Sequence, residues 1–387
     1  CKVDDFDAVS LYPSAMKRLG GYLIGKPKLL NTTDYEVIKN YDGYFVEIEI
    51  LKVNKHFKFP LMSIVDENSI RVFTNDMEGQ QLVVDKTTLE DLINFQKVEF
   101  IILRGYYYDE GRNQKLGGVI DYLFNQRLEA KKEKNPIQAV YKLLMNSSYG
   151  KTLLKPIEDE TSYVSNYKTD EDEESYFDKY ISKHYNEIKE VVELPNGKEY
   201  KVKLFKSIES HFNNCACGVE VLSMSKRIMN EVMCIAEDNN LNMYYQDTDS
   251  IHINTDDVAT LADEYHKKYN RELIGKQMGQ FHTDFDSKVI DKNIYAKESI
   301  FLGKKCYIDV LTGDNGEIDY HIRMKGVSCE SIKHYAINNK LNLLDVYKQL
   351  LNGRELAFDL CCDGSKVSFE FKKNMEIHSR EAFIRKI

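Results

Sequence analysis

Hydrophobic and polar residues alternate in several segments of this chain, and each such segment predicts a β-strand. Val3 to Ala8 is the first, and Tyr44 to Ile50 alternates in the way expected of a half-buried strand. Other apolar runs bounded by turn-forming residues predict further strands or sheet. They are Val98 to Tyr107, Asn242 to Tyr245, Ile251 to Ile253 and Lys288 to Val310. Beyond Gly326 the pattern predicts a small terminal unit of helix and strand.

Helical spacing of apolar residues predicts a helix from Thr87 to Phe95, with Thr87 or Thr88 as its N-cap. A longer helical pattern runs from Gly118 to Gly150 and is broken at Asn135-Pro136, because proline cannot continue the interior of a helix. This pattern predicts two helices packed back to back, with Asn135-Pro136 at the tip of the hairpin.

A polar segment follows from residue 151 to about 207. Within it, Asn196-Gly197 separates two strand-like runs, which is a strong signal for a β-hairpin. After it, Cys217 to Ala236 predicts one long buried helix that leads into the strand at Asn242.

The composition is that of a globular protein. With 387 residues, 42% hydrophobic and 30% charged, the chain has room for two or three subdomains. No run of eighteen apolar residues predicts a membrane span, and there is neither a secretory leader nor an initiator methionine, so we expect a fragment of a longer protein. The eight scattered cysteines lack paired Cys-x-x-Cys spacing, which argues against zinc and favours a reducing compartment.

The formal net charge of -9 argues at first against a nucleic-acid partner, because phosphate binding needs positive charge. The charge is unevenly placed, however. Acidic residues concentrate at 158–160 and 170–174, and basic pairs occur at 131–132, 304–305 and 372–373. Net charge therefore limits solubility more than it limits what a cleft can bind.

Aspartates form the first chemical motif, in Asp247-Thr248-Asp249-Ser250. Residues two apart on a strand face the same side, so we predict that the two carboxylates point together. Buried carboxylates without partners are costly, and Mg²⁺ would relieve that cost. Asp7, far away in the sequence, would complete the site. The alternative is a solvated β-turn, for which this tetrapeptide is well suited.

The segment Ser10-Leu11-Tyr12-Pro13-Ser14 predicts a strand-to-helix junction, with Pro13 in the first helical turn. Backbone amides at this helix start could bind a triphosphate. Tyr12 could stack beneath a sugar and exclude a 2′-hydroxyl. The alternative is a core tyrosine, in a chain that has 26 of them.

Cationic residues are predicted to share a face across the helical hairpin. Lys142 and Asn146 lie one turn apart, as do Arg127 and Lys131 on the partner helix. Such opposed faces would concentrate positive charge where phosphates bind. Solvated lysines on an amphipathic helix are the alternative, although Tyr149-Gly150 at the helix end also offers a helix stop and a base-stacking surface.

These motifs, in this order, resemble those of family B DNA polymerases, most of all the protein-primed branch of Bacillus phages, linear plasmids and adenoviruses. Asp7 to Ser14 resembles the first palm motif, and Lys142 to Gly150 is similar to the fingers motif. Tyr245 to Ser250 resembles the second palm motif, and Lys305-Cys306-Tyr307 the later Lys-x-Tyr motif, whose Lys and Tyr we expect on one strand face.

The resemblance implies an α+β polymerase right hand, with a palm of antiparallel sheet and helices, helical-hairpin fingers, a small thumb and two palm insertions. The implied divisions are palm 1–16, first insertion 17–118, fingers 119–150, second insertion 151–207, palm 208–323 and thumb 324–387. The first insertion would meet a priming protein, and the second would clamp the template. Family members carry a 3′–5′ exonuclease domain before the first palm motif, and this sequence lacks it, so we do not expect proofreading from this chain.

The resemblance also assigns roles to residues. Asp7 and Asp249 would bind two Mg²⁺ ions, which Mn²⁺ could replace, with Asp247 in support and the carbonyl of Ala8 as a further ligand. The nucleotide would be held by Leu11, Tyr12, Arg127, Lys131, Lys142 and Asn146. The DNA would be contacted by Tyr149, Gly150, Lys305, Tyr307 and Lys325.

Together the motifs predict the core of a DNA-directed DNA polymerase that adds dNTPs to a primer 3′-hydroxyl or to the hydroxyl of a priming protein. The expected partners are primer–template DNA, dNTPs and a terminal priming protein. We expect a monomer that does not bind membranes and acts inside cells, in host cytoplasm or a replication compartment. One alternative is a catalytically silent module that binds primer–template. Another is a transferase that uses RNA, against which Tyr12 argues.

Overall fold

The computed structural model describes residues 2–155, 158–170, 173–206, 214–359, 368–371 and 377–380. A seven-stranded antiparallel sheet within these residues has the order β13-β14-β1-β16-β17-β18, with β15 paired to the end of β1. Its strands are β1 (Val3–Ala8), β13 (Met243–Asp247), β14 (Ser250–Asn254), β15 (Phe281–Thr283), β16 (Tyr295–Gly303), β17 (Cys306–Thr312) and β18 (Ile318–Met324). The α+β class with an antiparallel sheet is confirmed, and residues 288–294 of the predicted Lys288 to Val310 segment precede β16 rather than join it.

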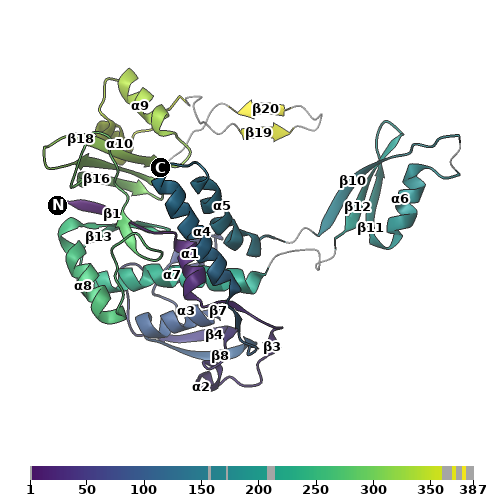
Figure 1. Cartoon of the computed structure of the whole chain (residues 1–387), viewed down its shortest axis with the longest axis horizontal. Coiled ribbons are helices and arrows are strands. Elements are labelled where there is room, and N and C mark those ends of the chain that lie inside the picture. The colour runs from purple at the N-terminus through teal and green to yellow at the C-terminus, as the bar shows by residue number, and fades with distance from the viewer. Residues whose placement is uncertain are drawn as a thin grey trace.

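Three helices pack with the β1–β13–β14 end of this sheet: α1 (Leu11–Arg18), α7 (Cys215–Asp238) and α8 (Val258–Tyr269). The long buried helix predicted from residue 217 to 236 is confirmed as α7. Its residues Val221, Ile228, Val232 and Ile235 recur at helical spacing and enter the main core. Figure 1 shows α7 running beneath α1 across the middle of the molecule.

The predicted helical hairpin is confirmed as α4 (Lys115–Lys132) and α5 (Gln138–Thr152). Its tip closes where the backbone N–H of Asn135 donates to the carbonyl of Ala130 at 2.8 Å, just before Pro136. Ile120 and Phe124 of α4 and Met145 of α5 are buried in the same core as α1 and α7. The hairpin is therefore held against the sheet by its root, as Figure 1 shows beside α1.

Residues 19–114, all described, form a unit with a core of its own, built around a four-stranded antiparallel sheet of order β3-β8-β4-β7. Its elements are β2 (Tyr22–Leu23), β3 (Lys28–Leu29), α2 (Tyr35–Ile38), β4 (Gly43–Val53), β5 (Ser63–Val65), β6 (Arg71–Phe73), β7 (Gln81–Asp85), α3 (Lys86–Asp91), a π-helical turn (Leu92–Gln96), β8 (Val98–Tyr108) and β9 (Arg112–Asn113). The predicted N-cap at Thr87 or Thr88 is wrong. Asp85 caps α3 by accepting from the backbone N–H of Thr88 at 3.1 Å, because its carboxylate is placed at the end of β7.

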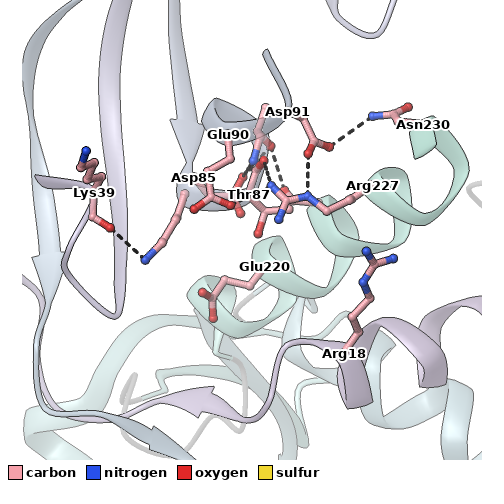
Figure 2. Close-up of polar contacts among 12 residues, drawn as sticks. Arg18, Lys39, Asp85, Thr87, Glu90, Asp91, Glu220, Arg227 and Asn230 are labelled. Carbon is pink, nitrogen blue, oxygen red and sulfur yellow. Dashed lines mark hydrogen bonds and ion pairs between the residues drawn. The ribbon is translucent and has the colours of Figure 1, made fainter. Parts of the chain in front are cut away.

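This unit is tied to α7 by the guanidinium of Arg227 (Figure 2). Arg227 donates to Asp91 at 2.5 Å, to Glu90 at 2.9 Å and to the carbonyl of Thr87 at 2.6 Å. Asn230, one turn further along α7, donates to the other oxygen of Asp91 at 3.4 Å. Burial raises the pKa of Asp91 to about 7, and Arg227 and Asn230 oppose that rise by favouring the ionised carboxylate.

The polar segment after the hairpin forms a second separate unit, which Figure 1 shows set apart from the rest of the chain. Between residues 158 and 206, the described strands β10 (Asp159–Ser165), β12 (Glu199–Phe205) and β11 (Ile188–Glu193) pair in that order, with α6 (Tyr176–His184) and a short 3₁₀ turn (Tyr185–Glu187) preceding β11. The predicted hairpin is confirmed, with Gly197 at φ 65° in the turn that joins β11 to β12.

The last described elements are α9 (Cys329–Asn338) and α10 (Leu343–Leu351), which pack on β16–β18, and the strand pair β19 (Ser368–Phe371) and β20 (Ile377–Arg380). The prediction of a small unit of helix and strand is thus confirmed. Residues 171–172 of the acidic run and the basic pair 372–373 lie outside the described residues. Within the described part of the chain, no helix combines the length and apolar character needed to cross a membrane.

Replacing Arg227 with alanine should destabilise the protein by roughly 3 kcal/mol, because the buried carboxylate of Asp91 would lose the cation that compensates its charge. The free energy of unfolding in urea measures this. Arg104→Ala is the matched control: that side chain is 79% exposed in its pair with Glu47, so its loss should leave stability nearly unchanged. Equal effects of the two substitutions would contradict the role given to Arg227.

Candidate active site

Asp7 and Asp249 are brought side by side by the pairing of β1 with β14. Asp7 lies opposite Ser250 in this antiparallel register, and the backbone N–H of Ala8 donates to the carbonyl of Asp249 at 2.8 Å. Thr248, at φ 55°, turns the chain between β13 and β14. Asp249 lies in this turn rather than on a strand, so the strand alternation from which we predicted a shared direction with Asp247 does not apply.

The two aspartates form a half-buried cluster of like charge. The pKa of Asp7 is raised to about 7, first by burial and then by the carboxylates of Asp249, Asp284 and Asp5, while the charge of Lys142 lowers it. Burial is also the main reason that the pKa of Asp249 is raised. Clustered carboxyls of this kind are suited to a divalent cation, which would favour their ionised forms.

Asp247 makes a different contact. Its carboxylate is paired with the ammonium of Lys305 at 2.8 Å. Lys305 lies in the turn between β16 and β17 at φ 57°, so the prediction that it shares a strand face with Tyr307 is wrong. No group of three or more His, Cys, Asp or Glu side chains in the described residues is arranged to hold a metal ion. Asp7 and Asp249 are the two predicted ligands that the pairing of β1 with β14 places together.

The turn that carries Lys305 is held from two sides. Its backbone N–H donates to the hydroxyl of Tyr245 at 2.8 Å, and its carbonyl accepts from the backbone N–H of Lys325 at 2.9 Å. Tyr307 is only 6% exposed, so its ring serves as packing beneath the turn. The Lys-x-Tyr residues and Lys325 are thus gathered at the edge of the acidic pair.

Tyr12 and Tyr149 stack on each other, with ring centroids 4.4 Å apart and planes 10° from parallel. This contact joins the start of α1 to the end of α5. Leu11 is 4% exposed and packs into the main core, so only its backbone could face a nucleotide. Ser10, at φ 54°, begins α1 in the left-handed region.

Cationic side chains approach this junction from the hairpin. Arg127 of α4 donates to the hydroxyl of Ser10 at 3.1 Å, and burial lowers the pKa of its guanidinium. Lys142 lies near enough to Asp7 to lower the pKa of that carboxyl. Lys131 and Asn146 are exposed, as is Gly150, where an added Cβ would meet no other atom. Of the four predicted hairpin residues, the structure therefore brings Lys142 close to Asp7 and Arg127 to Ser10 at the start of α1.

Asp284 belongs to this cluster and was missed in the sequence. It follows β15, its backbone N–H donates to the carbonyl of Asp5 at 2.8 Å, and its charge raises the pKa of both Asp7 and Asp249. No motif surrounds it in the sequence. Only the pairing of β15 with β1 brings it to the site.

A cavity of about 630 Å³ opens beside Tyr12 and Asp247. Its wall is formed by α7, by the turn between β16 and β17, and by the loop that follows β4. Three lysines from these separate segments line it: Lys58, Lys226 and Lys304. The cavity could receive an anionic polymer next to the acids, and Lys58 and Lys226 carry no sequence signal that would have identified them.

Comparison with known proteins agrees with these motifs. The profile of a family described as DNA polymerase type B, organellar and viral, matches residues 2–240. This chain belongs to that family. A protein named DNA polymerase from Acidianus bottle-shaped virus (isolate Italy/Pozzuoli) is 28% identical over 167 residues, which make up 39% of this chain and 23% of the viral protein.

The fold of this family B chain is similar to that of phi29 DNA polymerase. The structure of that enzyme complexed with primer-template DNA and incoming nucleotide substrates matches with a TM-score of 0.60 at 15% identity, over 99% of this chain and 58% of that one. Its binary complex with primer-template DNA matches with a TM-score of 0.55 at 16% identity, over 87% and 52% of the two chains. This chain thus spans little more than half of these polymerases.

Asp7→Asn should change the pH dependence of stability. Because the pKa of Asp7 is raised in the folded state, the native protein binds more protons than the unfolded chain between about pH 4 and 7, so this carboxyl removes stability as the pH rises through that range. In the absence of divalent metal, the variant should equal the wild type at pH 4. At pH 8 it should be more stable by about 1–2 kcal/mol after allowance for solvent screening.

Unfolding in urea at both pH values measures this difference, and Asp256→Asn, which removes an exposed carboxylate at the far end of β14, should follow the wild type. A constant difference between Asp7→Asn and wild type at all pH values would contradict the raised pKa.

Proposed function

We propose that this chain is the polymerising part of a DNA polymerase, which adds dNTPs to the 3′-hydroxyl of a primer on a DNA template. The acidic pair of Asp7 and Asp249, with Lys142 near Asp7 and Arg127 at Ser10, is the observation that carries this proposal. Two-metal phosphoryl transfer needs carboxylates for the cations and positive charge for the triphosphate. Membership of the family supports the same reaction.

The residues of the site would bind either the metal ions or the triphosphate. Asp7 and Asp249, with the carbonyl of Ala8 and with Asp247 in support, would hold two Mg²⁺ ions, or Mn²⁺ in their place. When bound, the ions supply Lewis-acid charge to the attacking and leaving oxygens. Lys142 and Arg127 would hold the triphosphate, with Lys131, Asn146 and the backbone of Leu11 as outer contacts. These groups would align the α-phosphate with the primer 3′-hydroxyl for in-line attack.

The pair of stacked tyrosines suits the sugar and base of the nucleotide. Tyr12 would lie beneath the deoxyribose, where its ring leaves no room for a 2′-hydroxyl. Tyr149 and Gly150 would contact the templating base pair, because an aromatic face offers stacking to any base. Lys305, Tyr307 and Lys325 would support the end of the primer.

The larger units of the chain would correspond to the parts of a polymerase. Residues 1–16 and 208–323 would be the palm, 119–150 the fingers and 324–387 the thumb. The unit at 17–118 would meet a terminal priming protein, and the unit at 151–207 would clamp the template. The separate core of the first and the detached position of the second support such roles. The protein would act as a monomer where viral or organellar DNA is replicated inside the cell.

Asp249→Asn should lower the rate of primer extension with Mg²⁺ by about 10³-fold or more, because the substitution removes an ionised metal ligand. Single-turnover extension of a labelled primer measures the rate, and Asp256→Asn is the control, because it makes the same chemical change in the exposed 3₁₀ turn (Thr255–Asp257) that follows β14. If the wild type binds primer–template tightly and incorporates no dNTP, the chain is a binding module instead. Equal extension by Asp249→Asn and wild type would make the catalytic assignment wrong.

Tyr12→Val should relax discrimination against ribonucleotides by roughly 10- to 100-fold, because it removes the ring that would fill the space of a 2′-hydroxyl. Tyr12→Phe keeps the ring and should remain selective for dNTPs. The ratio of kcat/KM for dNTP and rNTP incorporation tests both variants. Efficient use of rNTPs by the wild type would refute the preference for deoxynucleotides.

A further inference from the structure

The seven-stranded sheet is divided into two halves that share few main-chain contacts. β1 and β16 pair at one position, Val3 with Ala296, and then separate. One half, β1 with β13 and β14, carries the acidic pair. The other half, β16 to β18, carries the turn with Lys305. Phe301 of β16 stacks on Tyr245 of β13 at 5.1 Å, so the second half lies against the first through side chains.

His252 of β14 joins the two halves by polar contacts. Its Nδ1 lies 3.4 Å from Oδ1 of Asp5 on β1, and its Nε2 lies 3.3 Å from Oδ2 of Asp309 on β17. His252 and Asp309 are fully buried and Asp5 is 2% exposed. The contact of Nε2 with Asp309 is a hydrogen bond, whereas Nδ1 and the Asp5 carboxylate lie within ion-pair distance of each other without a hydrogen bond. His252 therefore spans the gap between the halves.

The Asp309 carboxylate is held in place by further contacts from its own half of the sheet. Ser299 donates to its Oδ1 at 2.6 Å, and His321 on β18 lies 3.2 Å from its Oδ2. Burial would raise the pKa of this carboxyl, but the hydrogen bonds from His252, His321 and Ser299 outweigh burial and lower the pKa to about 2. The second half thus presents a fixed, ionised carboxylate to His252.

The bridge also reaches the residues proposed to support the primer. The ring of His252 packs edge to face with Tyr245 at 5.6 Å, and with Phe301 and Tyr307 at 5.1 Å each. Tyr245 accepts the backbone hydrogen bond of Lys305. Displacement of His252 would therefore shift the Tyr307 ring beneath the turn, and also the Tyr245 hydroxyl that accepts the hydrogen bond from Lys305.

We propose that His252 is a positioning residue for nucleotidyl transfer: by bridging Asp5 and Asp309 it sets the distance between the Asp7–Asp249 pair and the turn with Lys305. The proposal rests on the polymerase function proposed above. Buried bridges of this kind add little net stability, because desolvation offsets their attraction. Their effect here is on geometry, since in-line attack requires the primer 3′-hydroxyl within a fraction of an ångström of its place.

His252→Gln tests this role, because glutamine can donate to one of the two carboxylates but cannot bridge both. We expect the single-turnover rate of incorporation to fall by about 10- to 100-fold, with the dissociation constants for dNTP and primer–template changed less than about threefold. His321→Gln is the matched control. Its contact with the same carboxylate of Asp309 lies within the β16–β18 half, and its ring reaches the other half only by an edge-to-face contact with Phe285, so the variant should stay within about threefold of the wild-type rate.

A double-substitution cycle with Tyr307→Leu separates positioning from general weakening of the fold. If His252 acts through that ring, the double variant should be no slower than the slower single variant, whereas independent structural effects would multiply. Thermal unfolding of each variant shows whether it is folded. Should His252→Gln fail to fold, Asp309→Asn releases the bridge from its other end and replaces it in the cycle.

A second readout does not depend on catalysis. With 2-aminopurine at the primer 3′ end and no dNTP, the fluorescence of the bound complex reports where the terminal base lies. His252→Gln should change this signal and His321→Gln should not. Equal rates and signals for the two variants, or multiplicative effects in the cycle, would overturn the proposal. A wild type that binds but never extends would refute the polymerase function, and the fluorescence comparison alone would then decide whether His252 sets the position of the primer end.

Discussion

Asp7 and Asp249 come together because β1 pairs with β14 in antiparallel register, and the whole candidate site depends on this pairing. The hydrogen bond from the Ala8 amide to the Asp249 carbonyl holds the end of the first strand against the β-turn. Pairing on the other edge of β1 adds Asp284 through β15. A slip of one residue in the register of β1 would turn the side chain of Asp7 to the opposite face of the sheet.

Gathering these acids opposes folding in the absence of a cation, and the surrounding structure compensates. Burial and mutual repulsion raise the pKa of Asp7. Lys305 neutralises Asp247, and Lys142 offsets part of the charge on Asp7. Holding these like charges close together therefore lowers the stability of the fold, which is common where a site must bind a cation and a charged substrate.

Three other groups of contacts keep this geometry rigid. The stacked pair of Tyr12 and Tyr149 joins α1 to the helical hairpin. Arg227 fastens α7 to the unit that follows α1. The bridge through His252 connects the halves of the sheet. Each lies at a junction between elements distant in the sequence, where a stacked ring pair or a set of polar contacts specifies one arrangement of the packed surfaces.

The sequence by itself determined the local elements and the main motifs. Alternation, helical spacing and turn residues predicted β1, the hairpin broken at Asn135-Pro136, α7 and the turn at Asn196-Gly197, because these depend on neighbours within a few residues. Tertiary structure decided the rest: that Asp247 pairs with Lys305 in a turn, that Asp284 joins the acids, and that Lys131 and Asn146 stay exposed. These outcomes depend on which strands pair and how the sheet halves meet, and no local pattern encodes contacts between residues so far apart.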